Sequence, residues 1–236
     1  MKIEKIATIY TDLPEKFGLP RQSGLVEGLT GRIVMEPQFR REEFFRELDG
    51  WSHIWLIWGF SESEGRWQPT VRPPRLGGNR RVGVFASRSP FRPNGLGLSA
   101  VRLLKIDWDC ADAPAIYVDG IDMMSGTPIY DIKPYATHSD CIPDAAGGFA
   151  AFVADADARV EADQELLDRL PEGKRQALIG ILAQDPAPAY QDDPDRVYGF
   201  KFAGFEIKFR KAAAGEDAGG KEDARPVIIL TDVIKL

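Results

Sequence analysis

The sequence predicts a mainly β fold, followed by a small α+β unit toward its C-terminal end. Up to about residue 121, short segments recur that are rich in Ile, Val, Phe and Trp. Gly, Pro and Asn separate these segments at short intervals, and no long helical periodicity is present. Many short strands joined by such turns favour a barrel or a sandwich over an alternating α/β sheet.

The first part of the chain contains six segments with the composition of strands. They are residues 3–10, 31–36, 51–60, 82–87, 97–106 and 115–121. A short helix is expected over 41–48, where Phe44, Phe45 and Leu48 mark one face.

The chain divides near residue 155. The stretch 143–158 is rich in small residues and is typical of a linker, so we expect a first domain over 1–150 and a second over 155–236. In the second domain we expect two helices, a hairpin, a low-complexity loop and a buried strand, over 164–170, 171–182, 197–210, 212–224 and 227–234.

Composition excludes several classes of protein. Two Cys and two His are too few for a disulfide scaffold or a His/Cys metal site, so we expect no metal. No signal peptide and no apolar run of membrane-spanning length is present, which predicts a soluble, cytoplasmic protein without a membrane partner.

The common catalytic motifs are also missing. The chain has no dinucleotide-binding fingerprint, no phosphate loop, and no Ser-His-Asp or Cys-His arrangement. His53 lies within an apolar, aromatic segment, and we expect it in the core or in an interface rather than as a base.

One segment has an unusual charge. The net charge of the chain is −6, yet the stretch between Glu64 and Asp107 has nine bases and no acid, while the rest has 36 acids and 21 bases. Eight of the nine are Arg, whose planar guanidinium can hold a phosphate or carboxylate through two hydrogen bonds. We therefore expect this segment to bind an anion, in preference to forming an ordinary solvated face.

Three polar residues alternate near the end of the first domain, in a segment that we group with the loops. If residues 125–135 are extended, Asp131, Lys133 and Tyr135 project from one face. An acid, an ammonium and a phenol side by side can position a substrate and accept a proton. A surface ion pair beside a packed Tyr explains the same spacing equally well.

Several long motifs resemble a known family. PRQSGLV at 20–26, RPPRLGGNRRVGVFASRSPFRPNGLGLSAVRLLKI at 72–106 and DGIDMMSGTPIYDIKPY at 119–135 resemble the TsaA-like, TrmO-type tRNA methyltransferases. AQDPAPAY at 183–190 resembles the C-terminal domain of the longer members, so the resemblance spans nearly the whole chain.

The resemblance implies a fold and an activity that composition does not. The fold is a β-barrel, without the Rossmann sheet of other methyltransferases, and the protein acts as a homodimer with its cofactor near the subunit interface. The implied activity is S-adenosylmethionine-dependent methylation of N6 of threonylcarbamoyladenosine, next to the anticodon of tRNA. Two alternatives stay open: a non-catalytic module that binds S-adenosylmethionine or another small anion, and an RNA-binding β-barrel without activity.

Site residues follow from the family motifs. The resemblance assigns to the cofactor Pro20, Arg21, Gln22, Ser61, Glu62, Arg88, Leu98, Ser125, Gly126, Thr127 and Pro128. Ser125 stands where relatives often have Asp, and Ser61 and Glu62 stand where some have His and Gln. The expected catalytic group is Asn94, Asp131, Lys133 and Tyr135.

Roles follow from the chemistry. We expect Asp131 or Tyr135 to accept the N6 proton or to orient N6, and Lys133 to meet the threonyl carboxylate or a phosphate. The residues expected to bind the tRNA are Arg66, Arg72, Arg75, Arg80, Arg81, Phe91 and Arg92. The second domain either touches the anticodon arm, through basic residues of its hairpin such as Lys201 and Lys211, or serves as a structural support; we favour the first.

Overall fold

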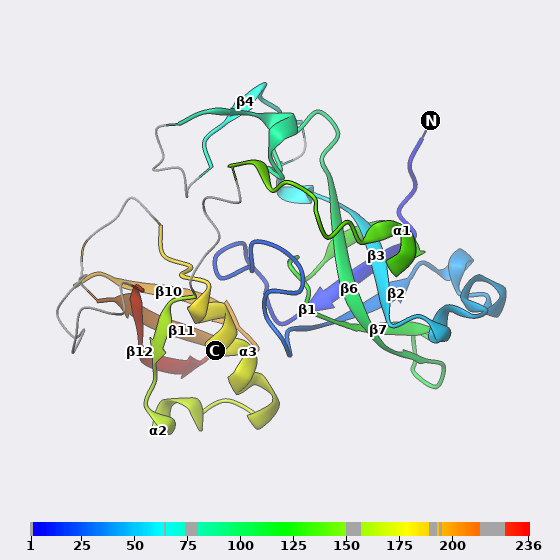
Figure 1. Cartoon of the computed structure of the whole chain (residues 1–236). Coiled ribbons are helices and arrows are strands. Elements are labelled where there is room, and N and C mark those ends of the chain that lie inside the picture. Colours follow the sequence, from blue (N-terminus) through cyan, green and yellow to red (C-terminus); the bar gives the residue numbers. More distant parts are fainter. Residues whose placement is uncertain are drawn as a thin grey trace.

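The computed structural model of the chain describes residues 2–63, 65–73, 80–149, 157–188, 193, 195–212 and 225–236 (Figure 1). The strands of the first part are β1 (Ala7–Thr11), β2 (Thr30–Met35), β3 (His53–Gly59), β4 (Thr70–Val71), β5 (Val82–Gly83), β6 (Leu96–Asp107), β7 (Ala115–Asp119) and β8 (Thr127–Pro134). Short helical segments there are α1 (Thr137–Asp140) and the 3-10 turns Pro37–Phe39, Glu42–Phe45, Leu48–Gly50, Ser61–Ser63 and Val84–Ala86.

Six of these strands close into an antiparallel barrel in the order β1-β2-β7-β6-β3-β8. Alternate side chains fill its interior; on β3 these are Ile54, Leu56 and Trp58, all buried. The Trp58 indole lies over Gly97 on β6, where a β-carbon would stand 2.2 Å from Trp58 Cε2. The mainly β fold is confirmed, and it is a barrel rather than a sandwich.

The part of the acid-free segment that precedes β6, residues 65–73 and 80–95, forms an arm outside the barrel. Strands β4 and β5 pair as a two-stranded sheet, which lies at the top of Figure 1. The predicted strand over 82–87 is wrong beyond Gly83, because the chain turns at Val84–Ala86, where the Ser87 hydroxyl donates to the Val84 carbonyl at 2.9 Å. Residues 74–79, which include Arg75, lie outside the described residues.

Two other local predictions are wrong. The expected helix over 41–48 is a 3-10 turn, because Glu47 adopts a left-handed conformation with φ 63° that a continuous helix does not allow. The segment 125–135 is largely strand β8, a central barrel strand between β1 and β3, rather than a loop. A register shift between Ile57 and Trp58 of β3 interrupts the alternation that would otherwise mark β8 in the sequence.

The second part of the chain is a four-stranded sheet with helices packed on it. Its elements are β9 (Arg159–Glu161), α2 (Gln164–Leu167), α3 (Glu172–Ala183), β10 (Val197–Phe202), β11 (Phe205–Lys211) and β12 (Val227–Lys235). The strand order is β10-β11-β12-β9, with β9 parallel to β12. The predicted hairpin, helices and last strand are confirmed near their expected bounds, whereas β9 was not expected.

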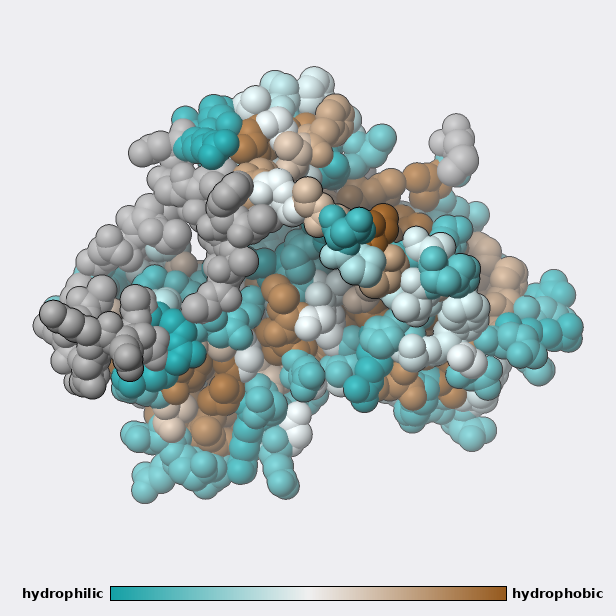
Figure 2. Space-filling view, in the orientation of Figure 1, coloured by the Kyte–Doolittle hydropathy of each residue, from teal (hydrophilic) through white to brown (hydrophobic). Residues whose placement is uncertain are grey.

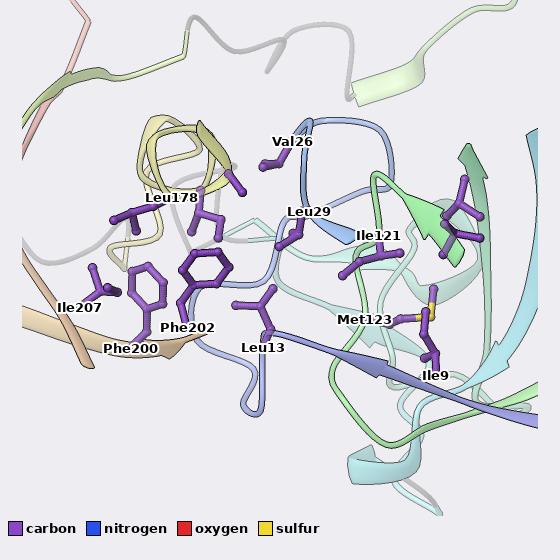
Figure 3. Close-up of a cluster of buried hydrophobic side chains, with 14 of the residues drawn as sticks. Ile9, Leu13, Val26, Leu29, Ile121, Met123, Leu178, Phe200, Phe202 and Ile207 are labelled. Carbon is purple, nitrogen blue, oxygen red and sulfur yellow. The ribbon is translucent and has the colours of Figure 1, made fainter. Parts of the chain in front are cut away.

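A single hydrophobic core runs through both parts (Figure 3). Ile9, Ile121 and Met123 lie at its barrel end, and Leu178, Phe200 and Phe202 lie at its other end. Leu13, Val26 and Leu29, from the loop between β1 and β2, lie between them. In the described part of the chain, no helix is both long and apolar enough to cross a membrane.

Candidate active site

The outer face of β6, β3 and β8 carries residues from two of the predicted groups. The strand register places Ile57 of β3 between Leu98 of β6 and Asp131 of β8, and it places Trp55 beside Lys133. Leu98 is 54% exposed, and Trp55 and Ile57 are half-buried. A predicted cofactor residue and predicted catalytic residues therefore share one solvent-facing surface.

Tyr135 continues this surface. Its backbone N–H donates to the His53 carbonyl at 3.0 Å, and its ring centroid lies 5.4 Å from that of Trp55. His53 is exposed, with its Nδ1 3.0 Å from the Ser52 hydroxyl. Of the two places expected for His53, the core is therefore wrong. The structure thus brings Asp131, Lys133 and Tyr135 to one face.

Asp131 and Lys133 form an ion pair on this face. Lys133 Nζ lies 3.1 Å from Asp131 Oδ2, and Asp131 Oδ1 accepts the backbone N–H of Ile132 at 3.0 Å. Both side chains are about half exposed, so the pair is weak and can open toward a ligand. The surface ion pair and the substrate-binding role are therefore compatible with each other.

The Pro-Arg-Gln turn lies between β1 and β2. Pro20 is buried, whereas Gln22 is half-buried and accepts a hydrogen bond from Arg88 through its amide oxygen. Arg21 turns away and donates to the carbonyl of Asp185 in the second part of the chain, at 3.1 Å. Two segments that the sequence assigned to one ligand, 20–22 and Arg88, are thus in direct contact.

A second pair of predicted segments meets at the end of β3. The Phe60 N–H donates to the Gly95 carbonyl at 2.8 Å, which brings the exposed Ser61 and Glu62 near the loop that precedes β6. Asn94, in that loop, is exposed and accepts the Leu96 N–H through its carbonyl at 2.7 Å. Asn94 does not lie on the strand face of the other predicted catalytic residues.

The loop before β8 is built around Gly126, whose φ of 87° favours glycine. Its N–H donates to the Ile9 carbonyl at 2.8 Å, and the Ser125 N–H donates to Leu13 at 2.8 Å. The Ser125 hydroxyl also accepts the Thr11 N–H at 3.2 Å. Ser125 therefore fastens the loop to β1, a task that leaves its N–H and hydroxyl oxygen engaged within the protein.

The arm presents both basic and aromatic side chains to solvent. Arg66, Arg72 and Arg80 are exposed, as are Trp67 (59%) and Phe85 (81%). Figure 2 shows hydrophilic side chains beside hydrophobic ones on this arm, at the top of the view. Between residues that the structure describes, no ion pair involves the arginines of the arm, which leaves their charges open to an anion.

Two arginines of the arm bind its own backbone. Arg81 donates to the hydroxyl and the carbonyl of Thr70 at 2.7 and 3.1 Å, and Arg92 donates to the Ser87 carbonyl at 2.9 Å. These hydrogen bonds hold the arm in shape. An anionic ligand can thus engage Arg66, Arg72 and Arg80 more easily than Arg81 and Arg92.

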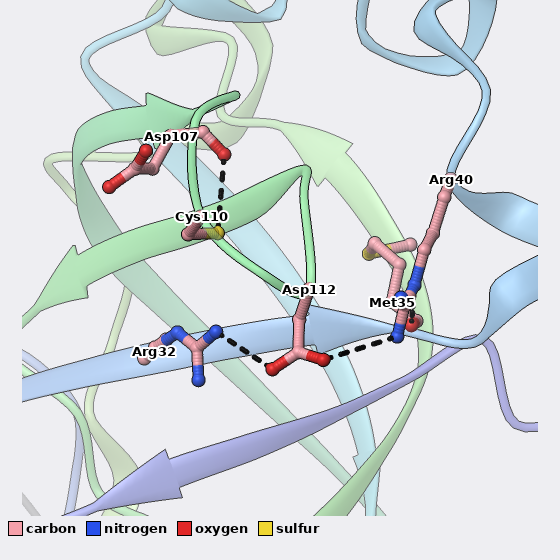
Figure 4. A network of polar contacts seen from close by, with 6 residues as sticks. All are labelled: Arg32, Met35, Arg40, Asp107, Cys110 and Asp112. Carbon is pink, nitrogen blue, oxygen red and sulfur yellow. Dashed lines mark hydrogen bonds and ion pairs between the residues drawn. The ribbon is translucent and has the colours of Figure 1, made fainter.

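Two basic residues on and after β2, on the opposite side of the barrel, pair with a carboxylate instead. Arg32 and Arg40 both pair with Asp112, at 3.0 and 3.9 Å, as Figure 4 shows. The hydrogen bond with Asp112 raises the pKa of Arg32. This network links β2 to the turn before β7, and it is a structural tie.

Comparison with known proteins identifies the family. The family model described as the tRNA-methyltransferase O N-terminal domain matches residues 8–141, and the TrmO C-terminal domain model matches residues 151–216. The chain belongs to the TrmO family. The resemblance seen in the motifs is therefore confirmed.

Relatives and solved structures cover almost the whole chain. The tRNA (adenine(37)-N6)-methyltransferase of Escherichia coli K12 is 36% identical over 223 residues, which are 91% of this chain and 94% of the relative. A putative S-adenosylmethionine-dependent methyltransferase, RcsF, of Pseudomonas aeruginosa is 38% identical over 214 residues (87% and 90%). A crystal structure of TrmO superimposes with a TM-score of 0.76 at 28% identity, covering 99% of both chains, and TrmO from Pseudomonas aeruginosa superimposes with a TM-score of 0.72 at 27% identity (99% and 98%).

One further residue of the candidate site, Asp122, lies within the motif at 119–135 but was not singled out from the sequence. Asp122, in the loop between β7 and β8, accepts the Ser99 hydroxyl at 2.6 Å, and Ser99 in turn accepts the Trp58 indole N–H at 2.9 Å. Burial raises the pKa of Asp122; hydrogen bonds, including one from the Ser23 backbone, and the charge of Arg88 partly offset this.

Asp122 therefore joins β6, the Pro-Arg-Gln turn and the Arg88 loop. In the sequence it lies between the apolar Ile121 and Met123, both fully buried. The sequence signal for Asp122 was a carboxylate flanked by two apolar core residues within a polar motif. A carboxylate in such a place is expected to be buried, and it then needs hydrogen-bond partners.

Proposed function

We propose that the protein is an S-adenosylmethionine-dependent tRNA methyltransferase that methylates N6 of adenine 37. The observation that carries this proposal is the convergence of the motif segments, 20–24, Arg88, 94–99 and 119–135, around one end and one face of a TrmO-type barrel. The E. coli relative, named for this activity, aligns along nearly the whole chain. No separate nucleotide-binding sheet is needed for such a reaction.

The finer substrate that we propose is adenosine 37 that already carries a threonylcarbamoyl group. Lys133 is exposed, and its partner Asp131 holds it only through a surface ion pair. Its ammonium suits the carboxylate of the threonyl group. Base 37 belongs to a single-stranded loop, so little base pairing has to be broken to reach it.

The residues near Gln22 suit S-adenosylmethionine in their chemistry. Arg88 offers a cation for its carboxylate, Gln22 offers an amide, and exposed Leu98 offers an apolar contact for its adenine ring. The buried Asp122, tied to Ser99 and Ser23, gives this region a fixed frame. When bound, the cofactor supplies an activated methyl group, so the protein itself need not activate the donor.

The task of this chain is to place N6 and to handle its proton. A carbamoyl group on N6 delocalises its lone pair, so an acceptor for the N6 proton is useful. Asp131 lies on the open face beside Lys133, and in our proposal its carboxylate accepts or orients that proton. Water is to be excluded at the moment of transfer, and the open strand face does not achieve this alone.

The need to exclude water from the open strand face supports a homodimer. The face of β6, β3 and β8 exposes Leu98 and half-exposes Ile57 and Trp55, all apolar, next to the polar site. In our proposal a second copy covers this face and completes the site at the interface. Since its substrate is tRNA, we also propose a cytoplasmic location.

The proposed function is tested with labelled S-adenosylmethionine and tRNA that carries or lacks the threonylcarbamoyl group. Label in the modified tRNA alone supports both the reaction and its finer substrate. Label in both tRNAs keeps the methyltransferase and removes the preference. Cofactor binding without any label supports the non-catalytic alternative, and salt-sensitive RNA binding without cofactor binding supports the structural one.

A further inference from the structure

The loop between β1 and β2, residues 12–29, packs against both parts of the chain. Gly18 has φ 90°, and a β-carbon there would stand 2.6 Å from Phe200 Cδ2 on β10. Farther along, Val26 contacts Gly180 of α3, where a β-carbon would stand 2.8 Å from Val26 Cγ1. Figure 3 shows Leu13, Val26 and Leu29 between the barrel and the second sheet. The loop is thus packed between the barrel and the second part of the chain.

Polar contacts fix the first half of this loop to the second part of the chain. Asp12 pairs with Lys174 of α3 at 2.6 Å, and its carbonyl accepts the Ala203 N–H at 2.9 Å. Glu15 accepts the Lys201 N–H at 3.0 Å. The positions of these residues therefore depend on α3, on β10 and on the turn that follows β10.

The Pro-Arg-Gln turn has its own tie to the second part. Arg21 donates to the Asp185 carbonyl at 3.1 Å, and Asp185 follows α3 in a left-handed conformation with φ 46°. Its carboxylate pairs with Lys211 of β11 at 2.7 Å, in surroundings that expose only 19% and 25% of the two side chains. Lys211 is thus occupied within the protein rather than part of a free basic face.

The Asp185 carboxylate also acts on Arg21 directly. Desolvation lowers the pKa of Arg21, and the charge of Asp185 opposes that shift. Among the described residues, Asp185 Oδ1 is buried without a hydrogen-bond partner, and Lys211 forms the direct ion pair that compensates the Asp185 charge, with Arg21 adding to it. Removing either member of the pair is expected to disturb the backbone carbonyl that Arg21 binds.

From these contacts we infer that Asp185 and Lys211 are positioning residues for methyl transfer, which act through Arg21 on the cofactor-binding turn. The second part of the chain is then a support for the cofactor site in the same molecule, in place of the tRNA contact that we favoured from the sequence. This inference rests on the proposed function, because it assigns the turn at 20–22 to S-adenosylmethionine.

The test compares Asp185→Asn and Lys211→Met with wild type. Asn tolerates the left-handed conformation and keeps the carbonyl, and Met keeps the length of Lys without its charge. We expect the Kd of S-adenosylmethionine, measured by calorimetry without tRNA, and its KM to rise about tenfold, as for the loss of one favourable charged contact. The affinity for tRNA and kcat at saturating cofactor are expected to stay within about twofold of wild type.

Asp232→Asn is the matched control, because Asp232 forms a more exposed ion pair with Arg169 in the same part of the chain, at 2.8 Å. It is expected to leave cofactor affinity unchanged. If wild type methylates tRNA but both test variants bind the cofactor as wild type does, the inference is overturned while the proposed function stands.

A loss of tRNA affinity with normal cofactor affinity also overturns the inference, and it supports the direct tRNA contact instead. If one test variant fails to fold, the other test variant is combined with Arg21→Lys. The inference predicts that the two substitutions change cofactor affinity non-additively, because the residues are coupled. Additive changes contradict the inference. If wild type transfers no methyl group, the proposed function has failed independently.

Discussion

Gly97 of β6 and Trp58 of β3 are paired neighbours in the barrel wall, and the Trp58 indole lies against Gly97 with no room for a further atom. Because a β-carbon at position 97 would stand 2.2 Å from Trp58 Cε2, Gly97→Ala forces the buried indole to move. We expect it to destabilise the protein by about 1–3 kcal/mol, the usual effect of overpacking a core. Urea unfolding measures the difference.

Gly95→Ala provides the control for this prediction. The nearest atom to a β-carbon at position 95 is Phe60 Cβ at 3.9 Å, and Gly95 has no positive φ. An equal loss of stability in both variants would show that the contact with Trp58 does not determine the effect of Gly97→Ala.

Asp122→Asn tests the buried carboxylate through the pH dependence of stability. The folded pKa of Asp122 is raised above its unfolded value, mainly by burial. Between these two pKa values the folded state binds the extra proton, so the contribution of Asp122 to stability falls as pH rises through its folded pKa. Below the unfolded pKa both states are protonated, so this contribution is fully present there and does not depend on pH.

The stability of Asp122→Asn relative to wild type is therefore expected to increase as pH rises from the unfolded pKa, about 3.9, and to level off above the folded pKa. Urea unfolding of both proteins across that range gives the difference directly. Comparing the two cancels the opposite trend of carboxyls with a lowered pKa, such as Asp140, which accepts the Trp55 indole N–H. A difference that shrinks with rising pH would contradict the assignment.

Asp131→Asn tests the proposed proton acceptor. A carboxylate that takes the N6 proton in the transition state contributes about 10²–10⁴ in rate, so kcat is expected to fall by a factor in that range. Affinities for S-adenosylmethionine and for tRNA are expected to change little. Single-turnover methylation of modified tRNA measures the effect, and Asp109→Asn, an exposed carboxyl outside the strand face, is the control. Unchanged turnover of Asp131→Asn removes Asp131 from the acid–base role.

Salt dependence tests the arm. If Arg66 and Arg72 each neutralise one tRNA phosphate, replacing both with Gln lowers the slope of log K against log salt by about 1.4–1.8. Filter binding at several salt concentrations measures that slope. Arg32→Gln is the control, because Arg32 is already neutralised by Asp112. An unchanged slope in the double variant would show that the tRNA docks elsewhere.

Sequence periodicity predicted the strands whose alternation is regular. On β3, Ile54, Leu56 and Trp58 point inward, and their spacing of two is visible in the sequence. Strand β8 was not predicted, because its alternation breaks at the register shift opposite Ile57 and Trp58. β9 has three residues and takes its partner, β12, from far along the chain, so no local signal marks it.

The candidate site was predictable where one motif supplies one face. Asp131, Lys133 and Tyr135 lie together because their spacing matches a strand, and the family motifs placed Gln22 and Arg88 in one group. The tie between Arg21 and Asp185 joins residues 164 positions apart, and only the packing of the second sheet brings them together. No pattern in the sequence indicates such a tertiary contact.

The position of β12 inside the second sheet has a consequence for the order of folding. All six strands of the barrel are present once synthesis has passed Pro134, whereas β9 and β11 gain their shared neighbour only after residue 235. A nascent chain therefore passes through a stage with a closed barrel and an incomplete second sheet. Early in that stage, before α3 and β10 are made, Leu13, Val26 and Leu29 lack their partners in the second part of the chain, and the exposed apolar loop is the segment that chaperones are expected to protect.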